Sequence, residues 1–191
     1  MKEDNHLLEA AIKLTKALNL VADEKLPGRL AGIVKLHAGI AVGSAFIPIA
    51  GADMAATVAN VWTMYIRINK ELELPFAANM LKSLAAGMIT NMGAAAASMV
   101  ILGSALKFIP VAGSLGGGAV MATTIYAITI ASGIVYMNVV AKLLSTKPAT
   151  HISEDDLKAA TNKIMEDKLS IQNIIKAAKV NYKEGKKNQK I

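Results

Sequence analysis

The chain has 191 residues, of which 53% are hydrophobic and 18% charged, with a formal net charge of +7. Disordered chains combine low hydrophobicity with high charge, so this composition excludes disorder and predicts one folded domain with small appended segments. The chain contains no cysteine, which excludes disulfide scaffolds, cysteine nucleophiles and thiolate metal sites.

Residues 1–28 are predicted to form an amphipathic helix. Leu7, Ala11, Leu14, Leu18 and Val21 repeat every three or four positions, which places them on one helix face. Such a face packs against the rest of its own protein, or against a membrane surface or a partner helix. Both interpretations are open from the sequence.

Charged residues are concentrated toward the two ends of the chain. Residues 36–141 contain only seven, and residues 36–52, 83–106 and 108–141 contain none. Uncharged runs of about 18 residues or more are typical of transmembrane helices. The sequence therefore predicts an apolar domain over residues 29–146, between polar ends.

An internal repeat divides this apolar domain. Residues 46–51, Phe-Ile-Pro-Ile-Ala-Gly, recur at residues 108–113 as Phe-Ile-Pro-Val-Ala-Gly. Proline ends a helix and glycine accepts backbone angles that other residues avoid, so each copy predicts a turn between two helices. The predicted turn residues are Pro48, Gly51, Asp53, Pro110 and Gly113, with Asp53 suited to capping the helix that follows.

The two turns predict two helical hairpins, 29–47 with 52–72 and 77–107 with 114–145, separated at Pro75. We therefore predict an all-α fold in which two repeated apolar hairpins form a four-helix bundle, with polar amphipathic helices at both ends. Small residues let helices approach closely, in lipid or in a tight soluble core. The predicted packing positions are Gly39, Gly43, Gly87, Gly93 and Gly133.

Residues 147–191 are predicted to form a polar helical segment with a basic tail. Ser153 followed by Asp156 is a capping-box pattern and predicts a helix start. A second helix is predicted by a single apolar stripe of Ile171, Ile174, Ile175, Ala178 and Tyr182.

The arrangement of cations predicts an orientation in a membrane. They gather on the side of the hairpins opposite the two predicted turns, so the positive-inside rule places both termini in the cytoplasm. Amphipathic rings and cations gather at the lipid headgroups, and the predicted interface residues are Trp62, Tyr65, Arg67 and Lys82.

The expected partners are anionic membrane lipid, a second copy of the chain, and a protein bound through the terminal helices.

No catalytic constellation is evident. His6, His37 and His151 lie in three separate segments, and the glycine-rich residues 113–118 lack the lysine and hydroxyl residue of a phosphate-binding loop. We expect no enzyme activity, no cofactor, no metal ion and no nucleic-acid partner.

The two turn motifs carry a family resemblance. Residues 47–53 and 109–114 resemble the Ile-Pro-x-x-Gly-Ala-Asp and Ile-Pro-x-x-Gly-Ser turns of the YcjF-type family, bacterial proteins with a domain of unknown function that often follows a small GTPase domain. The resemblance covers about residues 30–145. It implies a helical domain associated with the bacterial inner membrane. No GTPase domain is present in this sequence, so coupling to a nucleotide is not implied.

Three functions are open from the sequence. The first is a membrane-associated or membrane-inserted helical protein without catalytic activity, which acts as an anchor, scaffold or accessory module. The second is a soluble helical oligomeric interaction module. The third is a pore-forming or membrane-disrupting effector, in which polar helices cover an apolar hairpin.

Overall fold

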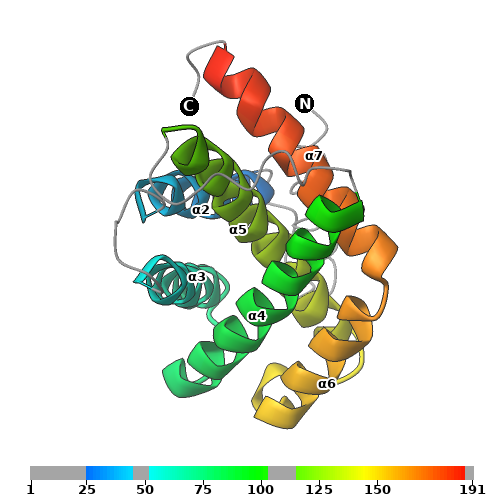
Figure 1. The fold of residues 1–191 in the computed structure, drawn as a ribbon. Coiled ribbons are helices and arrows are strands. Elements are labelled where there is room, and N and C mark those ends of the chain that lie inside the picture. The colour runs from blue at the N-terminus through cyan, green and yellow to red at the C-terminus, as the bar shows by residue number, and fades with distance from the viewer. Residues whose placement is uncertain (1–24, 45–51, 103–114, 188–191) are drawn as a thin grey trace.

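The computed structural model describes residues 25–44, 52–102 and 115–187 (Figure 1). This part of the chain contains α-helices and no strand, so the predicted all-α class is confirmed. The helices are α2 (Lys25–Ser44), α3 (Ala52–Glu71), α4 (Ala78–Leu102), α5 (Leu115–Leu144), α6 (Glu154–Met165) and α7 (Lys168–Lys187), with a short 3-10 helix, η2 (Ala149–His151), before α6.

Helix α5 is the centre of the fold. Figure 1 shows it with the α2–α3 pair on one side and α4 and α7 on the other. Between Ala122 and Ala141, every residue of α5 except Thr124 and Asn138 is buried. A helix that is apolar on all sides requires cover on all sides, and α2, α3, α4, α6 and α7 all contact it.

Helices α2 and α3 form an antiparallel pair. Arg29 near the start of α2 is bonded to Glu71 at the end of α3, with 2.8 Å between Nη1 and Oε1. The middle of α2 meets the middle of α3 through His37 and Asn60. The apolar residues that α2 buries are spaced by three or four, which places one face of the helix in the core: Leu30, Val34, Ala38 and Ala41.

A short turn joins α3 to α4. Asn69 secures it, because its side-chain amide donates to the carbonyls of Leu74 and Phe76, at 3.4 and 3.3 Å. Glu73 in this turn has a φ of 51°, in the left-handed region. Pro75 lies between the two helices, as its lack of a backbone N–H requires.

The C-terminal segment belongs to the same core. The predicted capping box is confirmed: the Ser153 hydroxyl accepts from the Asp156 N–H, and the Asp156 carboxylate accepts from the Ser153 N–H. Helix α7 extends to Lys187, so it includes part of residues 183–191, which the lysine-rich sequence predicts to be a frayed tail. Its predicted stripe buries Ile171, Ile175 and Ala178 in the hydrophobic cluster shared with α2–α5, and Ile174 packs at its edge.

Where a helix end lies clear of the undescribed residues, the end of α3, the start of α4 and the end of α5 each agree with the predicted bound to within one residue. Helix α3 ends one residue before the predicted position, and α5 spans Leu115–Leu144 against a predicted 114–145. Pro48, Gly51, Pro110 and Gly113 lie outside the described residues. Residues 1–24, and with them most of the predicted N-terminal helix, also lie outside.

Candidate functional site

The most distinctive feature of the described structure is the covered apolar helix α5. Within the described residues, one helix has the length and composition needed to cross a bilayer, the segment from Met121 to Leu144 of α5. In this conformation 78% of that segment is buried inside the protein. The core helix of a soluble protein meets the same criteria, so the segment alone does not place the chain in a membrane.

Two buried hydroxyls of α5 are bonded to the preceding turn of the helix. The Thr129 hydroxyl donates to the Ile125 carbonyl at 2.9 Å, and the Ser132 hydroxyl donates to the Ile128 carbonyl at 2.7 Å. A hydroxyl that donates to the preceding turn of its own helix keeps that hydrogen bond in any apolar environment, whether protein or lipid. The only charged residue of α5 is Lys142, which is exposed near its C-terminal end.

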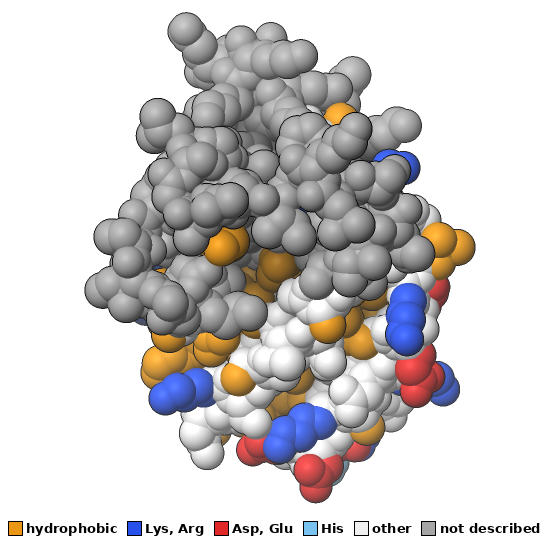
Figure 2. Space-filling model, in the orientation of Figure 1, with side chains coloured by type: hydrophobic (Ala, Val, Ile, Leu, Met, Phe, Trp, Pro, Cys, Tyr) orange, Lys and Arg blue, Asp and Glu red, His pale blue; other side chains and the backbone are white. Residues whose placement is uncertain are grey.

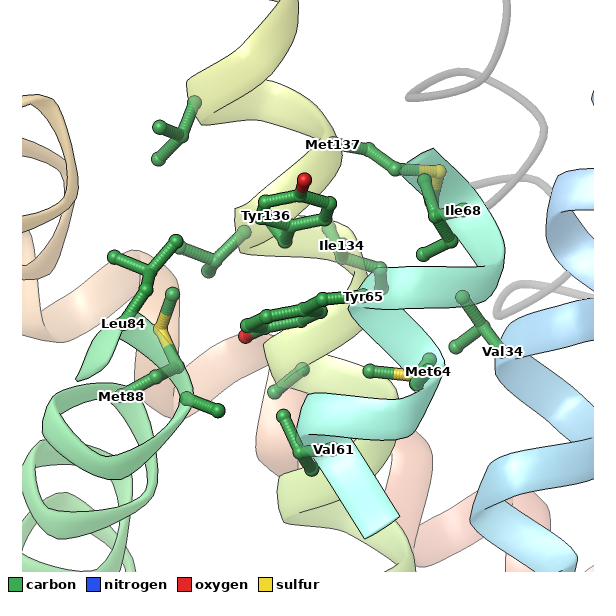
Figure 3. Close-up of a cluster of buried hydrophobic side chains, with 14 of the residues drawn as sticks. Val34, Val61, Met64, Tyr65, Ile68, Leu84, Met88, Ile134, Tyr136 and Met137 are labelled. Carbon is green, nitrogen blue, oxygen red and sulfur yellow. The ribbon is translucent and has the colours of Figure 1, made fainter. Parts of the chain in front are cut away.

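A stacked pair of tyrosines joins α3 to α5 in the core (Figure 3). The rings of Tyr65 and Tyr136 lie 4.1 Å apart between centroids with an interplanar angle of 18°. The Tyr136 hydroxyl donates to Asn69 Oδ1 at 2.8 Å, so it also orients the amide that secures the α3–α4 turn. Figure 3 shows Leu84 and Met88 of α4 beside the same pair, so three helices meet at this point.

A second buried polar pair joins α2 to α3. His37 is 2% exposed, and its Nδ1 lies 2.7 Å from Asn60 Oδ1. Asn60 Nδ2 donates to the His37 backbone carbonyl at 2.8 Å. The His37 Nε2 atom is buried without a hydrogen-bond partner in the described part of the chain.

The predicted packing glycines lie in different environments. A Cβ placed on Gly133 would lie 2.7 Å from both γ-carbons of Val34, so this position brings α5 close to α2. A Cβ on Gly39 or Gly87 would meet nothing within 4 Å, and both positions are exposed. Gly93 is half-buried in α4, and Gly43 lies in α2.

Two of the four residues predicted at a membrane interface, Trp62 and Lys82, lie together, and Tyr65 lies apart from them in the core. Tyr65 is fully buried in the core, where its ring serves helix packing. Trp62 is half-buried: its indole N–H donates to the Ala78 carbonyl at 2.9 Å, and the Lys82 amine lies 5.3 Å from its ring centroid. Arg67 and Lys82 are exposed, on α3 and α4 respectively.

Arg67 contributes to a charged surface cavity of about 470 Å³. Arg29 and Lys70 supply further cations and Glu71 and Glu73 supply carboxylates, so the lining has one more positive charge than negative. Asp53 is the second residue of α3, and its predicted capping role lies outside the described side chains. The described residues contain no group of three metal-ligating side chains.

Comparison with known proteins identifies no relative. No family model matches the chain, and neither the curated proteins nor the solved structures that were compared include a similar one.

Sequence reasoning missed the residues that join the helices in the core. The role of Tyr65 was detectable, because Val61, Tyr65, Ile68 and Leu72 repeat at helical spacing and all are buried. The pairing of Tyr65 with Tyr136 and of His37 with Asn60 was not detectable, since each pair joins positions on two different helices.

Proposed function

We propose that this chain is a membrane-associated helical protein without catalytic activity, which serves as an anchor, scaffold or accessory module. The observation that carries the proposal is the Met121–Leu144 segment, 24 residues whose only charge is near one end. At 1.5 Å per residue such a helix is about 36 Å long, and a bilayer core is about 30 Å thick. In the folded form, neighbouring helices cover this segment in place of lipid.

The cations of α3 and α4 support anionic lipid as the partner. Arg67, Lys70 and Lys82 are exposed, and Lys82 lies against the Trp62 ring. A cation and an indole side by side suit the headgroup region of a bilayer. Each Lys or Arg near an anionic surface adds about 1 kcal/mol of attraction. In the part of Figure 2 that is not grey, basic and acidic side chains both lie toward the lower and side edges, with uncharged and hydrophobic side chains between them.

The finer parts of the sequence-based interpretation belong to the same proposal. They are the two repeated apolar hairpins, the resemblance to the YcjF-type family, and a location at the bacterial inner membrane with both termini in the cytoplasm. Antiparallel pairing of α2 with α3 supports the first hairpin.

A second candidate function is a soluble oligomeric interaction module, and the outer face of α2 favours it. Leu36 is 52% exposed and Ile40 is 51% exposed. Beside them Gly28, Gly32 and Gly39 leave open space where a Cβ would be. An exposed face of apolar and small residues suits another helix, including α2 of a second copy.

Flotation of the purified chain with lipid vesicles tests the two candidates. Vesicles of phosphatidylcholine, with and without phosphatidylglycerol, are mixed with the protein and floated in low salt, in high salt and in carbonate. Surface attachment through lysines is lost in high salt, whereas inserted helices remain in salt and in carbonate. We expect binding that requires phosphatidylglycerol and that persists in carbonate once it has formed.

Two paired variants test the lipid-binding surface. Arg67→Gln with Lys70→Gln should weaken flotation in low salt severalfold, because both cations belong to the proposed surface. Lys163→Gln with Lys168→Gln removes the same charge from exposed positions on α6 and α7 and should weaken it less. Equal loss in both pairs would contradict a specific surface. A wild-type chain that never floats and elutes as a stable oligomer would favour the second candidate.

A further inference from the structure

His37 is held in one tautomer by its partner. Asn60 Nδ2 donates to the His37 backbone carbonyl at 2.8 Å, which fixes the orientation of the amide. Asn60 Oδ1 therefore faces His37 Nδ1, at 2.7 Å. An amide oxygen is only an acceptor, so Nδ1 carries the ring proton and Nε2 carries a lone pair.

The Nε2 atom has no partner for a second proton. It is buried, and no hydrogen-bond acceptor in the described residues reaches it. A neutral lone pair without a donor costs little compared with a buried N–H that carries positive charge and has no acceptor. The pocket around His37 thus accepts the neutral ring and disfavours the imidazolium.

Within the described residues, the charges near His37 do not compensate a proton. On α2 itself the nearest charged residue is Lys35, and on α3 the positive charge of Arg67 acts on the ring. The carboxylate of Glu71 is paired with Arg29. Helix α5 contributes only Lys142 as a charge, together with the neutral Tyr126 and Tyr136.

His37 lies where loosening α2 would uncover α5. Val34 is one turn before His37 on α2, and it lies against Gly133, where α2 and α5 approach each other closely. We propose that protonation of His37 releases α2 from α5 and thereby makes the apolar helix available to a membrane under acidic conditions. This inference rests on the proposed function and adds its regulation.

The direction of the pH effect follows from the state that the fold prefers. Burial, reinforced by Arg67, lowers the pKa of His37 below its ordinary value of 6.5, although the hydrogen bond to Asn60 opposes the shift. The unfolded chain therefore binds a proton at a higher pH than the folded chain. The stability that neutral His37 contributes is complete above 6.5 and is lost as the pH falls toward the folded-state pKa.

Urea unfolding without lipid tests the inference separately from the membrane function. Between about pH 7.5 and pH 5, the wild-type urea midpoint should fall by about 0.5 M for each unit by which the folded pKa is lowered. His37→Gln keeps a polar group beside Asn60 and cannot be protonated, so its midpoint should fall less. His151→Gln replaces an exposed histidine and should behave as the wild type does.

The same proteins are then floated with phosphatidylglycerol vesicles at the two pH values. We expect acid to increase carbonate-resistant binding of the wild type and of His151→Gln, and to increase that of His37→Gln much less. If His37→Gln showed the full acid dependence of the urea midpoint, the inference would be wrong. If the urea effect required His37 but no variant bound vesicles at either pH, the proposed function would fail while the pH-dependent contact remained.

An NMR titration of the wild type covers the case in which His37→Gln does not fold. The ring of His37 should be the Nδ1–H tautomer near neutral pH and should titrate below its ordinary value. An Nε2–H tautomer, or titration at or above 6.5, would overturn the inference.

Discussion

At the scale of single residues, two polar pairs determine how α2, α3 and α5 meet. Asn69 bonds to Tyr136 and Asn60 bonds to His37, and three of these four side chains are buried, with Asn60 only partly exposed. A buried polar group is costly without its partner, so each pair favours one arrangement of its two helices. Apolar contacts alone would permit several arrangements of the same helices.

The Tyr136 hydroxyl gives a direct test of this argument. Tyr136→Phe leaves Asn69 Oδ1 without its 2.8 Å donor and should lower the free energy of unfolding by about 1–3 kcal/mol. Tyr65→Phe removes a longer bond of 3.3 Å to the Ser132 carbonyl and should cost less than that. Chemical denaturation of both variants measures the difference, and a larger loss in Tyr65→Phe would contradict the account.

At the scale of helices, the close approach of α2 to α5 depends on one glycine. Gly133 faces Val34 with no room for a β-carbon, whereas Gly39 and Gly87 face open space. The pattern of small residues in the sequence predicted close packing at all of these positions. It could not distinguish them, because which face of a helix meets a neighbour is decided by the tertiary fold.

Replacing these glycines by alanine separates packing from helix propensity. Gly133→Ala inserts a methyl group against Val34 and should destabilise the fold by about 1–3 kcal/mol. Gly39→Ala and Gly87→Ala add no contact and should be neutral or stabilising by up to about 1 kcal/mol. Thermal unfolding of the three variants checks the order, and equal effects would refute the proposed role of Gly133.

The cap of α6 makes a pH-dependent contribution. Hydrogen bonds from Lys147 and from Ser153 lower the pKa of Asp156 from 3.8 to about 2, so its stabilisation is complete above 3.8 and is lost as the pH falls toward 2. Ser153→Ala should cost about 1 kcal/mol at neutral pH. Asp156→Asn should remove part of the acid sensitivity in that range. Urea midpoints measured between about pH 4 and pH 2 test both variants. If the midpoint of Asp156→Asn depended on pH as strongly as that of the wild type, the proposed role of the cap would be contradicted.

The C-terminal helices show which elements the sequence could predict. The capping box at Ser153 and the stripe of α7 are local patterns, and the prediction is confirmed for the box and for the stripe from Ile171 to Ala178, while Tyr182 lies outside the described side chains. That the stripe packs in the same cluster as α5 was not predicted, since this contact joins distant segments and α7 is polar in composition.

At the scale of the whole molecule, the central relation is between α5 and the helices around it. Its composition predicts a membrane span, and the structure buries 78% of the Met121–Leu144 segment within the protein. The surrounding helices of a soluble fold and the lipid tails of a bilayer can both remove this apolar surface from water. Composition alone could not decide between them, because both environments exclude water from the helix.

A disulfide between α2 and α5 tests most directly whether α5 must leave its cover to enter a bilayer. A Cβ at position 133 would lie 3.3 Å from Val34 Cβ, close to the usual separation in disulfides of about 3.5–4.5 Å. The chain has no cysteine of its own, so Val34→Cys with Gly133→Cys forms a single defined bond. Carbonate-resistant flotation with phosphatidylglycerol vesicles is measured for the oxidised and the reduced protein. We predict flotation of the reduced form and none of the oxidised form, and equal flotation of the two would contradict the account.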